Sequence, residues 1–173
     1  MTEFRQEKLV LREFRDSDSL RLAELCNNKK IHDNLRDLIP FPYSEKDAEY
    51  FINSCRNENP KVSLAVEYDG ELTGVIGLAI QTDIYRLSAE IGYWIGEPFW
   101  GKGIATRAVE LMVEYGFSQL GLIRIYSGVF DYNIASQRVM QKAGFQLEGI
   151  FKNSVYKNGT IHDEYRYGKV KNI

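Results

Sequence analysis

GEPFWGKGIAT, residues 96–106, stands between two segments whose apolar residues recur with different periods. The segment before it, RLSAEIGYWI (86–95), alternates apolar and polar residues, and this pattern predicts a β-strand. The residues after it are apolar at helical spacing, at Ile104, Ala108, Leu111, Met112 and Tyr115. Such a stripe predicts an amphipathic helix, so the glycine-rich stretch connects a strand to a helix.

On both sides of this junction the chain alternates between strand and helix patterns. Further strands are expected at 7–14, 62–68, 71–80 and 122–130, and in a closing hairpin over 145–170. Helices are expected at 16–28, 44–55 and 135–144. Asp69-Gly70 and Asn158-Gly159 are hairpin turn signals. These elements predict an α/β (α+β) fold with a mixed, mostly antiparallel sheet and one strand–loop–helix crossover.

Composition and charge predict one soluble domain, residues 1–173. The 22 Lys plus Arg and 24 Asp plus Glu give a formal charge of −2, with no block of like charge that would suit nucleic acid. No segment reaches the roughly 18 apolar residues of a membrane span, and the N-terminus lacks the apolar core of a signal peptide. We therefore expect a cytoplasmic protein that binds neither nucleic acid nor a membrane.

Cys26 and Cys55 are the only cysteines, and His32 and His162 are the only histidines. These counts exclude a disulfide framework and argue against a cysteine or histidine metal site. We expect no metal and two cysteines that act as small core hydrophobes, with a catalytic thiol as the alternative.

The glycine-rich stretch has the chemistry of an anion site. A helix that begins after such a turn directs free backbone N–H groups and the positive end of its dipole at a ligand, and phosphate suits that place. Gly101 and Gly103 remove Cβ atoms from the approach, and Lys102 adds a positive charge. The stretch also spells the G-x-x-x-x-G-K of a P-loop, but Gly103 stands where Mg²⁺ requires a Ser or Thr hydroxyl. A P-loop hydrolase and a plain turn without a ligand are the alternatives.

Two separated motifs carry a family resemblance. AEIGYWIGEPFWGKGIATRAV (89–109), followed by NIASQRVMQKAGF (133–145), resembles the GCN5-related N-acetyltransferases, or GNAT superfamily. The chain looks most like the branch of ribosomal-protein N-terminal acetyltransferases and their small-molecule relatives. The resemblance covers nearly the whole chain, because 9–18, 34–52 and 144–165 follow that branch in order. It implies a twisted sheet with helices on both faces.

The resemblance implies that acetyl-CoA is the acetyl donor. Its pyrophosphate would be held, mainly by backbone N–H groups, at Gly101, Lys102, Gly103, Ile104, Ala105 and Thr106. The strand end formed by Tyr93, Trp94 and Ile95 would pair with the pantetheine amides as though the cofactor were an added strand. Trp100 departs from the Gln or Arg that is usual in the family, and we expect it to pack under the loop without touching phosphate.

The second motif implies two further contacts and one departure. Asn133 matches the family asparagine that touches the cofactor arm, and Ser136 matches this branch's serine near the thioester sulfur. Helix capping is the simpler interpretation of both residues. Many members have a tyrosine general acid where this chain has Met140, which cannot donate a proton. Ser136, or a water that it holds, is then the expected acid.

Acetyl transfer to an amine requires a neutral nucleophile. An α-amino group has a pKa near ~8 and a lysine near ~10.4, so both are mostly protonated at neutral pH. Glu90 is the expected base, acting through water, because it lies on the strand that meets the cofactor. A salt bridge or a solvent-facing position is the alternative for Glu90. The amine can attack the thioester directly, so no acyl-enzyme is required.

The acceptor is expected to be a primary amine, either a protein N-terminal α-amine or a small-molecule amine, and the sequence does not identify it. Expected substrate contacts are Asn34, Arg36 and Tyr43 in the 34–43 loop and Asp163 in the closing hairpin. A non-catalytic acyl-CoA-binding or sensor module is the alternative, because Met140 removes the usual acid. The exposed hairpin edges favour a homodimer.

Overall fold

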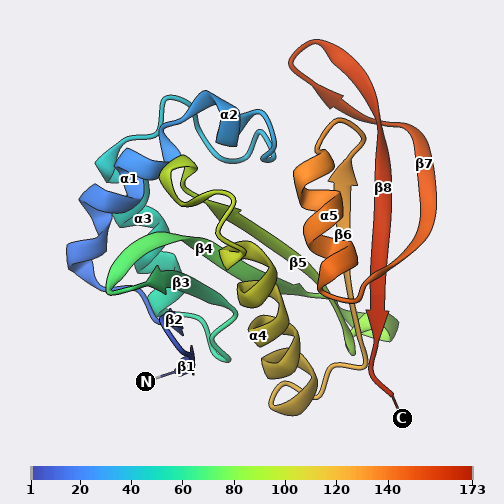
Figure 1. Cartoon of the computed structure of the whole chain (residues 1–173), viewed down its shortest axis with the longest axis horizontal. Coiled ribbons are helices and arrows are strands. Elements are labelled where there is room, and N and C mark those ends of the chain that lie inside the picture. Colours follow the sequence, from blue (N-terminus) through green and yellow to red (C-terminus); the bar gives the residue numbers. More distant parts are fainter. Residues whose placement is uncertain (1, 173) are drawn as a thin grey trace.

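The computed structural model describes residues 2–172 (Figure 1). The strands are β1 Glu3–Gln6, β2 Leu9–Arg12, β3 Ser63–Tyr68, β4 Glu71–Ile80, β5 Ser88–Ile95, β6 Arg124–Phe130, β7 Gln146–Lys157 and β8 Thr160–Val170. The α-helices are α1 Ser19–Cys26, α2 Lys29–His32, α3 Glu45–Arg56, α4 Ile104–Ser118 and α5 Ile134–Lys142. Short 3-10 turns occupy Asp16–Asp18, Asp83–Tyr85 and Glu97–Phe99.

The eight described strands form one sheet in the order β1-β2-β3-β4-β5-β6-β8-β7. Every neighbouring pair is antiparallel except β5 and β6, which are parallel and joined by α4. The predicted mixed, mostly antiparallel sheet with one strand–loop–helix crossover is therefore confirmed. The β7–β8 hairpin turns at Asn158-Gly159 as expected, and β8 rather than β7 lies against β6.

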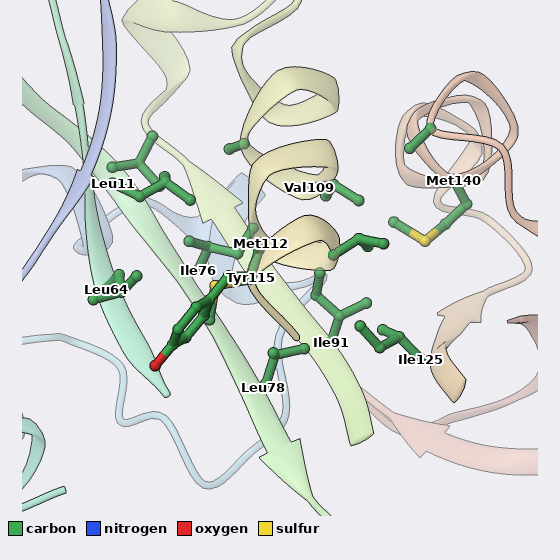
Figure 2. Close-up of a cluster of buried hydrophobic side chains, with 14 of the residues drawn as sticks. Leu11, Leu64, Ile76, Leu78, Ile91, Val109, Met112, Tyr115, Ile125 and Met140 are labelled. Carbon is green, nitrogen blue, oxygen red and sulfur yellow. The ribbon is translucent and has the colours of Figure 1, made fainter. Parts of the chain in front are cut away.

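Helices cover both faces of the sheet, because the strands carry apolar side chains on both faces. On one face, Ile91 and Ile125 pack with Val109 and Met112 of α4, in the cluster drawn in Figure 2. On the other face, Ala65 and Leu72 pack with residues of α1 and α3 in a second cluster. Adjacent strand residues point to opposite faces, so one sheet serves both layers.

Two elements differ from the expectation. The predicted strand over 7–14 is shorter, since Glu7 has a φ of 53° and turns the chain between β1 and β2. β1 was missed because its residues, EFRQ, are mostly exposed at the sheet edge and lack apolar alternation. The predicted helix over 16–28 ends at Cys26, and Asn28 caps the four-residue α2 by accepting a hydrogen bond from the Lys30 N–H.

The chain between α2 and α3 is fixed against the far end of the sheet. Tyr132 donates a hydrogen bond to the carbonyl of Asp33, and Lys157 is ion-paired with Asp37. These contacts bring the 34–43 loop beside the tip of the β7–β8 hairpin. No helix among residues 2–172 is long and apolar enough to cross a membrane.

Candidate active site

The sheet opens between β5 and β6. The two strands pair at three positions, the last of which is Glu90↔Tyr126. Beyond it, β5 stays paired with β4 as far as Ile95, and β6 stays paired with β8 as far as Phe130. The edges of β5 and β6 that face each other separate into a wedge, and within the described chain no strand pairs with either of these two edges. A ligand with amide groups can pair with such an edge.

The glycine-rich loop places a helix N-terminus beside this wedge. Gly101 and Gly103 have φ values of +76° and +72°, the left-handed region in which other residues are strained. Gly103 is the N-cap of α4, and no side chain caps this helix. Its first N–H groups therefore lack intrahelical partners. A Cβ at either glycine would meet no atom within 4 Å, so the space above the loop is open to a phosphate.

Aromatic residues hold the loop in place. The Trp100 indole Nε1 donates a hydrogen bond of 2.6 Å to the carbonyl of Ile95, which joins the loop to the end of β5. The Lys102 Nζ lies 5.3 Å from the centre of the Phe99 ring, and Lys102 is exposed. Trp100 thus braces the loop, and Lys102 is accessible to an anion above it.

Helix α5 borders the wedge on the β6 side. The Asn133 side chain caps α5 by accepting a hydrogen bond of 3.1 Å from the Ser136 N–H. The Ser136 hydroxyl lies 2.7 Å from the hydroxyl of Tyr93 on β5. Burial raises the pKa of Tyr93 to about 12, against the opposing effect of this hydrogen bond. Met140 is 0% exposed and belongs to the main core, so its side chain cannot reach a ligand.

Glu90 lies where β5 and β6 begin to separate, and it is ion-paired. Arg36 from the 34–43 loop donates a hydrogen bond of 2.6 Å to Glu90 Oε1. This bond raises the pKa of Arg36, with smaller electrostatic contributions from Glu164 and Tyr126. The Arg36 side chain is 71% exposed and that of Glu90 is 21% exposed, so the pair can open at little cost.

A second carboxylate, Glu164 on β8, lies near the same arginine. Arg166 donates to Glu164 Oε1 through both its Nε and Nη2 atoms. The Glu164 carboxylate lies over Gly128 of β6, where an added Cβ would meet its Cδ at 2.6 Å. Glycine at 128 therefore leaves room for this carboxylate, and in this part of the wedge the carboxylates of Glu90 and Glu164 are paired with the guanidinium groups of Arg36 and Arg166.

A polar cavity of about 440 Å³ lies between α2, the chain after β6 and the hairpin tip. Its lining is Lys30, Asp33, Asn34, Tyr132, Lys157, Asn158, Thr160 and His162. Asn34 donates a hydrogen bond through Nδ2 to the carbonyl of Lys30, and its buried Oδ1 is without a hydrogen-bond partner in the described chain. Of the four predicted substrate residues, Asn34 thus lines a cavity and Arg36 contacts Glu90.

The other two predicted substrate residues are placed differently. Tyr43 is 9% exposed and packs in the cluster with α1 and α3, so it is a core residue. Asp163 accepts hydrogen bonds from Lys152 Nζ and the Asn153 N–H, which use its carboxylate inside the β7–β8 hairpin. Neither the Tyr43 ring nor the Asp163 carboxylate is brought to Glu90 by a contact in this structure.

The cysteines lie in the core. Burial raises the pKa of Cys26 to about 12 and, together with nearby Glu58, that of Cys55 to about 11. Both thiols therefore stay protonated at neutral pH, which is unsuitable for a nucleophile. Among residues 2–172 there is no group of three or more His, Cys, Asp and Glu side chains placed to hold a metal ion.

Three residues at the site were not among the sequence predictions for side-chain roles. The hydroxyl of Tyr93, the ring of Tyr126 and the carboxylate of Glu164 come from three different strands. For Tyr93 and Tyr126, strand alternation predicts which face of the sheet the side chain lies on, but not which residue it meets across the wedge. Glu164 gives no local signal, because its position depends on β8 lying next to β6.

Comparison with known proteins points to one family. A family model described as "Acetyltransferase (GNAT) domain" matches residues 8–146. "Putative ribosomal N-acetyltransferase YdaF" of Bacillus subtilis is 39% identical over 170 residues, which cover 95% of this chain and 92% of YdaF. "Uncharacterized N-acetyltransferase YoaA" of the same species is 45% identical over 101 residues, so the chain matches only 56% of that relative's length.

A solved structure shares the fold. The "Microcin C7 self immunity acetyltransferase MccE in complex with Acetyl-CoA and AMP" superposes with a TM-score of 0.82 and 28% identity, covering 96% of this chain and 94% of that one. The match of the family model to most of the chain, and of YdaF to nearly all of it, confirms the resemblance seen in the two motifs. The chain therefore belongs to the GNAT family of N-acetyltransferases.

Proposed function

We propose that this protein transfers the acetyl group of acetyl-CoA directly to a primary amine within a ternary complex. The observation that carries the proposal is the wedge between β5 and β6, which leads from the open, uncapped N-terminus of α4 to the carboxylate of Glu90. One end of this path suits a pyrophosphate and the other suits a cation. The proposed catalytic domain spans residues 1–173.

The donor end would hold acetyl-CoA largely through backbone atoms. The N–H groups from Gly101 to Thr106 would bind the pyrophosphate, helped by the charge of Lys102. The free edge of β5 from Tyr93 to Ile95 would pair with the pantetheine amides. Asn133, which caps α5 at the edge of the wedge, would contact the cofactor arm. Each of these roles is proposed from the position of the residue in the structure.

The acceptor end would deprotonate the amine. Glu90 is proposed as the base, acting through water, and the acceptor's ammonium would replace the Arg36 guanidinium beside it. Glu90 would first take one proton from the ammonium through water and release it to solvent. The neutral nitrogen then forms a bond to the carbonyl carbon, and a second nitrogen proton passes through the same water toward Glu90. As the C–S bond breaks, its electron pair goes to sulfur, and the resulting thiolate accepts a hydrogen bond from Ser136. No covalent enzyme intermediate is needed.

The acceptor class follows from the same charges. With Arg36 displaced, Glu90 would be left without its cation and would favour an ammonium, and the polar cavity lined by Asn34 would offer room for the rest of an acceptor. A protein N-terminal α-amine and a small-molecule amine both meet these requirements. The name of YdaF supports the first of these for a relative, and the panel below distinguishes them for this chain.

The second candidate function is a non-catalytic acyl-CoA-binding module. It is favoured by two observations, the burial of Met140 at the position of the usual acid and the ion pair that occupies Glu90. Such a module would bind acetyl-CoA with the same loop but release no thiol in the presence of any amine.

The test is an acceptor panel with acetyl-CoA and the full chain. Peptides with a free α-amine would be paired with the same peptides blocked at the N-terminus, beside polyamines and aminoglycosides. We expect thiol release and a matching acetyl mass increase for at least one class, and none for the blocked peptides. Binding of acetyl-CoA without thiol release from any acceptor would instead establish the binding module.

A thermal shift experiment provides an independent check of the donor. Acetyl-CoA should raise the melting temperature, because it binds the folded state alone, whereas Mg-ATP should not. If Mg-ATP raised the melting temperature and acetyl-CoA did not, the loop would instead be interpreted as a P-loop. The remaining expectations from the sequence stay predictions. Light scattering would check the homodimer and cell fractionation the cytoplasmic location. Elemental analysis would check the lack of metal, and binding assays the lack of nucleic-acid and membrane partners.

A further inference from the structure

The hydroxyl of Tyr93 has one side-chain partner among residues 2–172, Ser136, which is proposed to hydrogen-bond the departing sulfur. Tyr93 extends from β5 and Ser136 from the first turn of α5, and their oxygens lie 2.7 Å apart. No second side-chain hydrogen bond to either hydroxyl occurs within residues 2–172. The bond therefore connects the two sides of the wedge at the level of residue 93, three residues beyond Glu90 on the same strand.

Either hydroxyl of the pair can be the hydrogen-bond donor. The Ser136 N–H already donates a hydrogen bond to Asn133 Oδ1, so the hydroxyl is the polar group of Ser136 that remains available to a ligand. With its pKa raised to about 12 by burial, Tyr93 stays protonated at neutral pH and can donate. A serine hydroxyl has a single proton and two acceptor lone pairs. When Tyr93 donates to Ser136 Oγ, the serine proton is free for another acceptor.

We propose that Tyr93 is a positioning residue for the transfer reaction. Its hydroxyl donates to Ser136 Oγ and thereby directs the serine proton at the coenzyme A sulfur as the C–S bond breaks. This inference rests on the proposed function. The thioester sulfur is a weak acceptor and the departing thiolate a strong one, so the hydrogen bond strengthens as charge develops. No proton transfer is required, because the thiolate leaves hydrogen-bonded and takes a proton from water later.

The Tyr93 hydroxyl also compensates for the residue at 140. Met140 is buried in the core and has no proton to donate, so the site has no tyrosine from α5. Tyr93 supplies a hydroxyl from the opposite side of the wedge, through Ser136. Cooperativity between the two hydrogen bonds makes the serine a better donor than it would be alone.

A purely structural role is the competing explanation, in which the hydrogen bond only attaches α5 to β5. The matched control is Tyr115→Phe, because the Tyr115 hydroxyl donates a hydrogen bond of 2.9 Å to the Lys61 carbonyl, away from the wedge. Tyr93→Phe and Tyr115→Phe remove the same group from buried tyrosines and should destabilise the protein to a similar degree. Only the first should affect the reaction.

The kinetic experiment compares Tyr93→Phe, Ser136→Ala, the double variant and Tyr115→Phe with wild type, using an acceptor found in the panel. We expect Tyr93→Phe to lower kcat about 10-fold with KM for acetyl-CoA unchanged, in the range seen when a supporting hydrogen bond is removed. In the Ser136→Ala background the same change should have no further effect. An unchanged kcat, or an equal loss in both backgrounds, would overturn the proposal.

A second measurement does not depend on turnover. Ultraviolet absorbance of the thiolate gives the pKa of the coenzyme A thiol when bound to each variant. We expect this pKa to be about one unit higher in Tyr93→Phe than in wild type, equal to the 10-fold kinetic loss, and unchanged in Tyr115→Phe. Equal thiol pKa values in wild type and Tyr93→Phe would refute the role of Tyr93. A wild type that binds coenzyme A but acetylates nothing would refute only the proposed function.

Discussion

Arg12 and Arg36 are each ion-paired with a carboxylate on the sheet, and the two arginines differ in burial. Arg12 on β2 is bonded to both oxygens of Asp18 and to Glu67 on β3, and its side chain is 4% exposed. Arg36 has a single hydrogen bond to Glu90, and its side chain is 71% exposed. The chemical groups are the same in both places.

The difference in burial distinguishes an ion pair that stabilises the fold from one that can take part in a binding site. Removing Arg12 would leave the Asp18 carboxylate without its cation and Glu67 with only the more distant, exposed Arg15, which costs far more than a surface pair contributes. Opening the Arg36–Glu90 pair returns an arginine to water and costs little. The burial of the arginine, rather than residue type, therefore distinguishes the pair that can open from the pair that cannot.

The largest expected effect is on stability, at the buried pair. Arg12→Met should lower the free energy of unfolding by about 3–5 kcal/mol, because Asp18 and Glu67 lose their shared cation. Urea denaturation monitored by circular dichroism measures the change. The matched control is Arg36→Met, for which we expect a loss of at most about 1 kcal/mol. Similar losses in the two variants would show that burial does not distinguish these arginines.

The next effect is on catalysis, at the exposed pair. Glu90→Gln should lower kcat about 100-fold, the lower end of what general acid–base catalysis contributes, with the urea midpoint unchanged. Steady-state thiol release at saturating acetyl-CoA gives this value. Glu67→Gln is the counterpart at the buried pair, and there we expect lost stability with kcat preserved in the folded fraction. Full activity in Glu90→Gln would remove Glu90 from the mechanism.

A smaller effect should appear in acceptor affinity. Arg36→Gln removes the cation that competes for Glu90, so KM for the amine should fall up to about 5-fold, the equivalent of roughly 1 kcal/mol. The variant's kcat should change little. Increasing ionic strength should reduce the difference between variant and wild type, because salt screens an exposed pair. A higher KM in Arg36→Gln would mean that Arg36 binds the acceptor directly.

The smallest effect concerns a carboxylate at the surface, outside both pairs. Asp47 accepts hydrogen bonds from the Ser44 side chain and N–H in the capping box of α3, and these bonds lower its pKa. The stabilisation is present above the ordinary aspartate pKa and is lost as pH falls through the lowered value in the folded state. Asp47→Asn should therefore be slightly less stable than wild type at pH 7, and the difference should disappear in acid. A constant difference across this range would show that the charge is not responsible.

Much of the fold could be predicted from periodicity and turn residues. The β5–loop–α4 junction, the helix expected over 44–55 and the Asn158-Gly159 turn lie where the sequence placed them. β1 could not be identified, because an exposed edge strand needs no apolar alternation. The four-residue α2 was also missed, since its stability comes from contacts with the rest of the protein and one Asn28 cap.

The two ends of the candidate site also differ in how far they could be predicted from the sequence. The donor end is a continuous segment whose function depends on backbone conformation, so its glycines are visible in the sequence. The acceptor end combines Arg36 from a loop, Glu90 from β5 and Glu164 from β8. Tyr43 was predicted for this end and lies in the core, because its ring packs against α1 and α3.

The sequence by itself determined the strand-to-helix junction at residues 96–106, the family and the chemistry of the donor, since local spacing sets backbone conformation and a helix N-terminus needs no distant partner. Only the tertiary structure decided that β5 and β6 separate after Glu90, that Arg36 occupies its carboxylate and that Tyr93 meets Ser136. These contacts join residues far apart in the chain, and their geometry depends on strand order and burial, which no local pattern specifies.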